Sequence, residues 1–136
     1  MKHPVAIIIL LLNTFFSSLS YNEDEVNNIF QKFESGLKNA NVDEFYMYLD
    51  SEIYLNLGQG ISGYFSSNQS YYLINNFLQE CNPISFSLYK KEIDEDSPSA
   101  LGSFFYNRKG IRGNYKVFLA LTKTNSGWKI SQISFN

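Results

Sequence analysis

Histidine and cysteine are almost absent from this sequence of 136 residues, which has one of each, His3 and Cys81. A single cysteine cannot form a disulfide within the chain, and so few thiols and imidazoles exclude disulfide frameworks and most zinc sites. Basic residues are not in excess either, since 11 lysines and arginines stand against 13 acidic residues. We therefore expect no nucleic-acid partner, because nucleic-acid binding needs a basic surface.

Long apolar runs are also missing. The run at residues 5–12 has eight residues, well short of the roughly 20 that a membrane-spanning helix needs. Lys2 precedes it, and Ser18 and Ser20 follow it as small residues before Tyr21. This pattern is typical of a signal peptide. We expect residues 1–20 to be removed and the protein to be exported, periplasmic or secreted, with no membrane anchor; a buried N-terminal strand or an uncleaved anchor are the alternatives.

Cleavage would leave a single domain of 116 residues, 21–136, with ten basic and 13 acidic residues and a net charge of −3. The only histidine leaves with the signal peptide. Without a histidine as a base, Cys81 is expected to be a buried free thiol that packs as a small hydrophobe rather than a nucleophile.

Three segments show the apolar spacing of helices. The first begins at Asn22 and ends where Gly36 and Asn39 occur, the second begins at Asn41, and the third runs from Ser66 to the Asn82-Pro83 stop. Each begins with Asn or Ser followed three residues later by Glu or Gln, the arrangement of a capping box.

Alternating apolar and polar residues predict five strands, over about residues 52–57, 84–93, 101–108, 115–121 and 128–135. Gly58, Gly60 and Gly63 predict a loop before the third helix. Ile130 and Ile133 are three apart, which requires either a bulge or a strand that is apolar on both faces.

The element order α-α-β-α-β-β-β-β predicts an α+β fold, with N-terminal helices on one face of an antiparallel sheet. The strand at 101–108 is apolar on both faces, since Phe105 opposes Phe104 and Tyr106. A second apolar face needs a cover, either a helix or another subunit. We therefore expect a homodimer formed through the sheet.

Three segments carry a family likeness: Asn41-Val42-Asp43 running into residues 49–55, the Gly60-Ile61-Ser62-Gly63 loop, and the closing Gly127-Trp128-Lys129-Ile130. With this order the chain resembles the nuclear transport factor two-like superfamily, a cystatin-like α+β fold. Residues 63–77 are most similar to short exported bacterial proteins of unknown function within it. The resemblance implies a strongly curved sheet around the helices, with a conical cavity open at one end, and no established activity.

Enzymes of that superfamily are not matched at their catalytic positions. Isomerases place a carboxylate just after the first strand, but no Asp or Glu lies between Glu52 and Glu80; dehydratases use a histidine, which residues 21–136 lack. We therefore assign no catalytic residue and no cofactor, and expect a non-catalytic binding or interaction module. The alternative is a small cavity enzyme, of isomerase, dehydratase or hydrolase type, with an unrecognised acid–base pair.

Tyrosine is the feature that points toward a site. Ten tyrosines and 12 phenylalanines exceed what a core of this size requires, and tyrosine suits a pocket or an interface because its large ring has a polar tip. The residues expected to line a cavity, with a small apolar or aromatic ligand, are Tyr46, Tyr64, Tyr72, Tyr106, Arg108 and Tyr115. Each tyrosine could equally be a half-buried strand or helix residue.

Arg108, Lys109, Arg112 and Lys116 form a basic cluster near one expected hairpin. Charges there keep a sheet edge soluble, although Arg108, on the face of Phe104 and Tyr106, could bind a carboxylate. The acidic run 94–96 lacks the spacing of a calcium loop, so we expect no metal site.

Overall fold

The computed structural model describes residues 23–93 and 96–136, so the expected signal peptide and most of the acidic run lie outside the described residues. A helix covers residues 23–38 and is called the N-terminal helix below. The elements after it are η1 (Val42–Glu44), η2 (Tyr46–Tyr48), β1 (Leu49–Gly58), β2 (Ile61–Ser66), α2 (Ser67–Cys81), β3 (Pro83–Glu92), β4 (Ser99–Arg108), β5 (Ile111–Thr124) and β6 (Gly127–Phe135).

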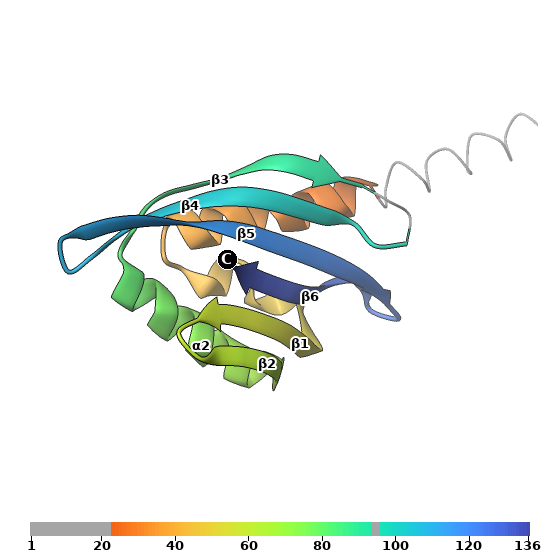
Figure 1. Ribbon diagram of the computed structural model, residues 1–136. Coiled ribbons are helices and arrows are strands. Elements are labelled where there is room, and N and C mark those ends of the chain that lie inside the picture. The colour runs from red at the N-terminus through yellow and green to blue at the C-terminus, as the bar shows by residue number, and fades with distance from the viewer. Residues whose placement is uncertain (1–22, 94–95) are drawn as a thin grey trace, which may run out of the picture.

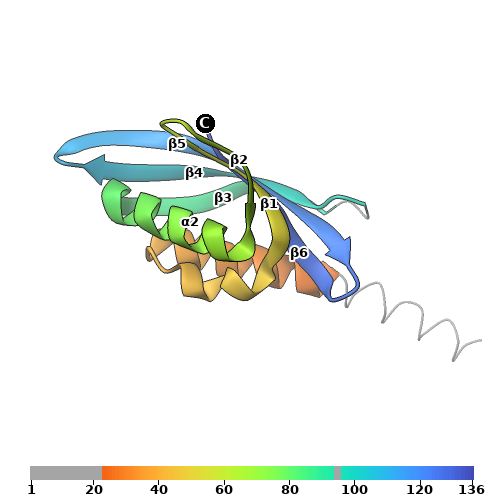
Figure 2. The same cartoon turned by 90° about the horizontal axis from the view of Figure 1, so that it is seen from below.

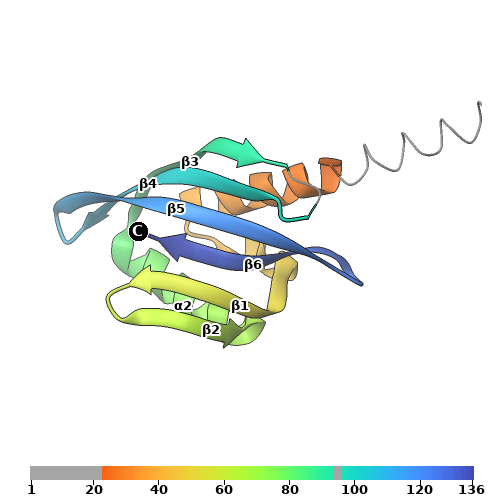
Figure 3. The same ribbon diagram turned by 45° about the vertical axis from the view of Figure 1, so that its right-hand side comes forward.

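The strands form one six-stranded sheet in the order β2-β1-β6-β5-β4-β3, with β2 and β3 at its edges (Figure 3). The N-terminal helix and α2 lie against the same face of this sheet (Figures 1 and 2). The α+β class and the packing of helices on one sheet face are therefore confirmed. Within the described residues, no helix is long and apolar enough to cross a membrane.

The sheet differs from the expected one in direction and curvature. β1 and β6 run parallel, so the sheet is mixed rather than wholly antiparallel. Alternation along one strand cannot reveal this, because it says which side is buried but not which strand is the neighbour. The sheet is also not strongly curled.

The expected loop at Gly58–Gly63 is a strand instead. Gln59 and Gly60 have φ angles of 52° and 86°, the backbone of a two-residue hairpin turn. β2 then pairs with β1 from Ile61 to Ser66. Gly58 and Gly60 therefore mark a tight turn between two strands, and Gly63 lies within the second strand, which is the sixth strand of the sheet.

The expected second helix is also different. It consists of two 3-10 turns that meet at Phe45, whose backbone (φ −124°, ψ 2°) leaves the helical region. This break turns the Phe45 ring into the core, where it is fully buried and packs edge-on against Phe33 at 5.1 Å. Core packing of one ring therefore overrides the helical pattern of a short segment.

Candidate functional site

Phenylalanine rings fill the space between α2 and the strands β4 and β6. The Phe77 ring lies 4.6 Å from that of Phe135 and 6.4 Å from that of Phe104, and Phe104 and Phe135 are 5.4 Å apart. None of the three is more than 6% exposed. This part of the interior, which the resemblance assigns to a conical cavity, is a packed aromatic core.

Two tyrosines and an arginine gather beside that core. The Tyr106 and Tyr115 rings stack at 5.1 Å with an angle of 24° between their planes, and the Arg108 guanidinium carbon lies 5.3 Å from the Tyr106 ring centre. Tyr106 and Arg108 are two residues apart on β4, so they share a face, while Tyr115 lies on the neighbouring β5. We call these three residues the rim cluster.

The thiol of Cys81 is the hydrogen-bond partner that the structure adds to the rim cluster. Arg108 Nη2 donates to Cys81 Sγ at 2.9 Å. Burial raises the pKa of the Cys81 thiol, and Arg108 opposes this only partly. Cys81 is fully buried and free, as expected. A protonated thiol without solvent access is not a nucleophile.

Arg108 is partly buried and lacks an acidic partner. Its Nε atom is buried without a hydrogen-bond acceptor, and within residues 23–93 and 96–136 no carboxylate lies within ion-pair distance of it. The hydrogen bond to the thiol is the main cause of its raised pKa. The Tyr115 pKa is also raised, chiefly by burial. At neutral pH the rim cluster therefore presents the Arg108 cation beside the neutral hydroxyl of Tyr115.

The other three residues expected at a cavity lie elsewhere. Tyr46 and Tyr72 are on the outside, each with its ring edge-to-face to Tyr71, at 5.1 and 5.4 Å. Tyr64 is 70% exposed on the outer face of the sheet, where it packs against Tyr54. The six expected residues therefore do not form one site, because the element order alone does not show which face of each element is inward.

Sequence reasoning missed the contact between Cys81 and Arg108, which are 27 residues apart. It forms because the backbone N–H of Asn107 donates to the Asn82 carbonyl at 3.1 Å, which ties β4 to the end of α2. No local pattern in the sequence signals this pairing.

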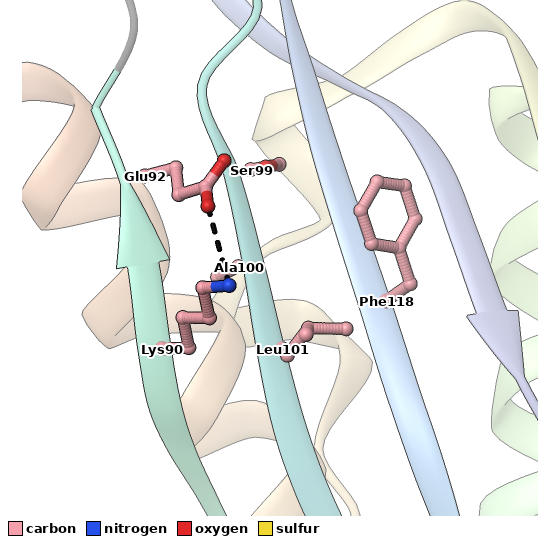
Figure 4. Close-up of a pocket in the computed structure, with 6 residues that line it drawn as sticks. All are labelled: Lys90, Glu92, Ser99, Ala100, Leu101 and Phe118. Carbon is pink, nitrogen blue, oxygen red and sulfur yellow. Dashed lines mark ion pairs between the residues drawn. The ribbon is translucent and has the colours of Figure 1, made fainter.

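A depression of about 100 Å³ lies on the opposite, outer face of the sheet (Figure 4). Lys90 and Glu92 flank it with an ion pair at 3.4 Å, and Leu101 and Phe118 are its apolar wall. Sites for small molecules usually measure about 300–1,000 Å³. The depression is therefore too small to enclose a ligand. It belongs to an apolar strip around Leu101, Phe105 and Phe118 that no helix of the described residues covers.

Residues 30–136 match the family described as Domain of unknown function (DUF4783). A DUF4783 family protein from Bacteroides uniformis is similar in structure, with a TM-score of 0.69 and 19% identity over 78% of this chain and 94% of that one. A DUF4783 family protein from Bacteroides ovatus has a TM-score of 0.66 and 18% identity, over 76% of this chain and 90% of the other.

A ketosteroid isomerase-like protein from Erwinia carotovora atroseptica has a TM-score of 0.64 with 8% identity, over 81% of this chain and 91% of that chain. Likeness at these identities shows the fold alone. No curated protein matches the chain. The fold is nuclear transport factor two-like, as the sequence resemblance implied. The match over residues 30–136 shows that the chain belongs to the DUF4783 family.

Proposed function

We propose that this protein is an exported, non-catalytic binding module whose rim cluster holds the carboxylate of an aromatic or apolar small molecule. The observation that carries the proposal is Arg108, which is partly buried and whose Nε atom has no acceptor. A guanidinium taken from water is usually paired with an anion. A ligand carboxylate would supply the charge that the described chain does not.

The neighbours of Arg108 favour an aromatic carboxylate over an inorganic anion. Tyr106 and Tyr115 form a stacked pair of rings beside the guanidinium, and aromatic ligands pack favourably against such rings. A carboxylate matches the forked geometry of the guanidinium. One aromatic carboxylate can therefore contact the guanidinium and the tyrosine rings at the same time. The ligand would lie over the rim rather than inside the cone, since Phe77 and its neighbours occupy the interior.

A small cavity enzyme is the alternative, and it has less support. It would need an open interior beside an acid–base pair, whereas the rings of Phe77, Phe104 and Phe135 fill the space beside the rim cluster. The Cys81 thiol is buried and its pKa is raised, which is the opposite of what a nucleophile requires. These observations support binding over catalysis.

Calorimetric titration of the purified protein with benzoate and with its neutral isostere benzamide tests this proposal. Benzoate is expected to bind and benzamide to bind at least tenfold more weakly, because a charged hydrogen bond contributes about 1.5–3 kcal/mol. Arg108→Gln should abolish the difference between the two ligands. Arg112→Gln is the matched control, since Arg112 is an exposed residue of the neighbouring strand β5. Equal binding of the two ligands to the unaltered protein would refute the proposal.

A second candidate function, assembly as a homodimer through the outer face of the sheet, rests on a different observation. Leu101 and Phe118 lie directly opposite each other on β4 and β5, and Phe105 on the same face is 44% exposed. The helices cover the other face (Figure 2), so this strip has no cover within the described chain. An apolar strip without cover is typical of an interface.

A further inference from the structure

A second group of tyrosines, separate from the rim cluster, lies on the outside of η2 and α2. Tyr46 is 38% exposed, Tyr72 60%, and Met47, the residue after Tyr46, 67%. Figure 2 shows α2 along the outside of the fold, with no other element over its outer side. Large side chains this exposed mark a surface that contacts something else when they gather rather than scatter.

The three rings of this group hold one another in place. Tyr46 meets Tyr71 at 5.1 Å and 78°, and Tyr71 meets Tyr72 at 5.4 Å and 86°, both edge-to-face. Asp43 lies beside the Tyr71 hydroxyl, and its interaction with that hydroxyl is the main cause of the raised Tyr71 pKa. The outer rings therefore lean on a central ring that packs against the core, so little conformational freedom remains to be lost on binding.

The rest of the exposed side of α2 consists of amides. Asn68, Tyr72, Asn76 and Gln79 are all exposed, and their spacing of four, four and three residues places them on one side of the helix. The row extends over about 16 Å at the rise of an α-helix. No charged residue occurs in α2 before Glu80.

Two charged side chains of opposite sign contact this group. Asp43 lies beside the Tyr71 hydroxyl and raises its pKa, and Lys129 Nζ donates to the Met47 carbonyl at 2.9 Å. With one charge of each sign beside it, this surface gives no net electrostatic preference to an acidic or basic peptide, a nucleic acid or a lipid headgroup. Its charge matches a neutral partner.

We propose that this surface, the tyrosine–amide face (Tyr46, Tyr71, Tyr72, Asn68, Asn76 and Gln79), binds a neutral carbohydrate chain. Sugar rings present C–H faces with a slight positive charge, which pack on the negative faces of aromatic rings. Their hydroxyls both donate and accept hydrogen bonds, and an amide side chain offers a donor and an acceptor together. An elongated row on one helix side suits a chain of sugars better than a single compact ligand.

The tyrosine–amide face is independent of the rim cluster. Tyr72 lies in the first half of α2, whereas Arg108 contacts Cys81 at the end of that helix, about 14 Å further along its axis. A variant of this protein can therefore lose carboxylate binding at the rim cluster and keep carbohydrate binding at the tyrosine–amide face. Arg108→Gln is expected to leave carbohydrate binding unchanged.

Affinity electrophoresis through gels that contain soluble polysaccharides tests this inference. The neutral probes are amylopectin, mixed-linkage β-glucan and mannan, and the charged probes are polygalacturonate and heparin. At least one neutral polymer should retard the protein, and the charged polymers should not. Tyr72→Ala is expected to weaken the retardation at least tenfold, because aromatic contact area is lost.

Tyr89→Ala is the matched control. The exposed fraction of Tyr89, 55%, is similar to that of Tyr72, but Tyr89 lies on the edge strand β3. Thermal melts of both variants should equal that of the unaltered protein, and Tyr46→Ala provides a second variant if Tyr72→Ala melts early. If none of the neutral polymers retards the protein, the inference is overturned. Equal effects of Tyr72→Ala and Tyr89→Ala, or stronger retardation by a charged polymer, also overturn it.

Discussion

Replacing Gly36 by alanine is expected to destabilise the protein, whereas the same change within a helix is usually stabilising. Gly36 lies in the N-terminal helix, where alanine normally adds up to about 1 kcal/mol of stability. Here a Cβ would overlap the Phe45 ring and lie 2.8 Å from the Asn41 carbonyl oxygen. Gly36→Ala is expected to lower the free energy of unfolding by about 1–3 kcal/mol, the usual cost of overpacking. Urea denaturation measures it, with the exposed Gln31→Ala of the same helix as control.

A gain in stability for Gly36→Ala would show that the Phe45 ring can move aside. That result would contradict the reason given above for the break between η1 and η2, namely that the core fixes this ring beside Phe33.

Titration of Cys81 and Tyr115 is expected to lower the stability of the folded protein at alkaline pH. Burial raises the pKa of both groups, so the folded protein holds these protons more tightly than the unfolded chain. Their contribution is fully present below the unfolded pKa values and is lost as pH rises through the folded ones. Stability should therefore fall above about pH 8.5, the ordinary pKa of cysteine. Denaturant melts between neutral and alkaline pH measure this fall.

Cys81→Ala should make the fall shallower, because the thiol no longer titrates. The loss of an acceptor for Arg108 lowers stability equally at each pH and so leaves the slope unaffected. An unchanged slope in this variant would show that the thiol does not contribute.

The spacing of Ile130 and Ile133 predicts either a bulge or a strand that is apolar on both faces. The structure shows the bulge. Leu121 pairs with Ile130 and Ala120 with Gln132, so one extra residue lies between them. Both isoleucines are fully buried on the core face as a result. The odd spacing predicted an irregularity, but only the partner strand could show which kind it is.

Among the elements, the edge strand β3 is protected by a side chain from a helix. The backbone N–H of Leu88 donates to Glu34 Oε2 at 2.6 Å, and the register of β3 shifts between Leu88 and Lys90. A bulge and a capped N–H both prevent another strand from adding to the edge. The N-terminal helix therefore has a role beyond burying its apolar side.

Glu34→Ala is expected to lower the free energy of unfolding by about 1.5–3 kcal/mol, the contribution of a hydrogen bond to a charged group. Glu34→Gln should recover part of it, since the amide oxygen can still accept. Chemical denaturation measures stability, and amide hydrogen exchange at Leu88 reports the bond directly. Equal stability of the alanine variant and the unaltered protein would show that water replaces the carboxylate without cost.

Elements with their own local signals could be predicted from the sequence, and those that depend on distant contacts could not. The start of α2 is a capping box as expected, with Ser66 and Gln69 bonded to each other's backbone N–H at 3.1 Å. In contrast, the parallel pairing of β1 with β6 and the Arg108–Cys81 contact join segments far apart in the chain. For the same reason, the sequence did not show that Tyr46, Tyr64 and Tyr72 lie on the outside of the fold.

At the scale of the whole molecule, the proposed export would determine the length of the mature chain. If residues 1–20 are removed as proposed, intact mass measurement of the protein from its source should give a chain that begins at Tyr21. The protein should be found outside the cytoplasm in fractionated cells. A mass that includes residues 1–20, in a cytoplasmic fraction, would contradict the proposal.

Assembly is the last property of the whole molecule that the structure allows to be tested. A homodimer through the outer face would bury Leu101, Phe105 and Phe118, and a charge placed there would remain in a dry interface at a cost of several kcal/mol. Light scattering of the chain from residue 21 onward should give twice the monomer mass, and Phe105→Lys should give the monomer mass. Ile111→Lys is the control, because Ile111 is 73% exposed at the end of the β4–β5 hairpin. A monomer mass for the unaltered protein at high concentration would contradict the dimer, and the apolar strip would then require a different partner.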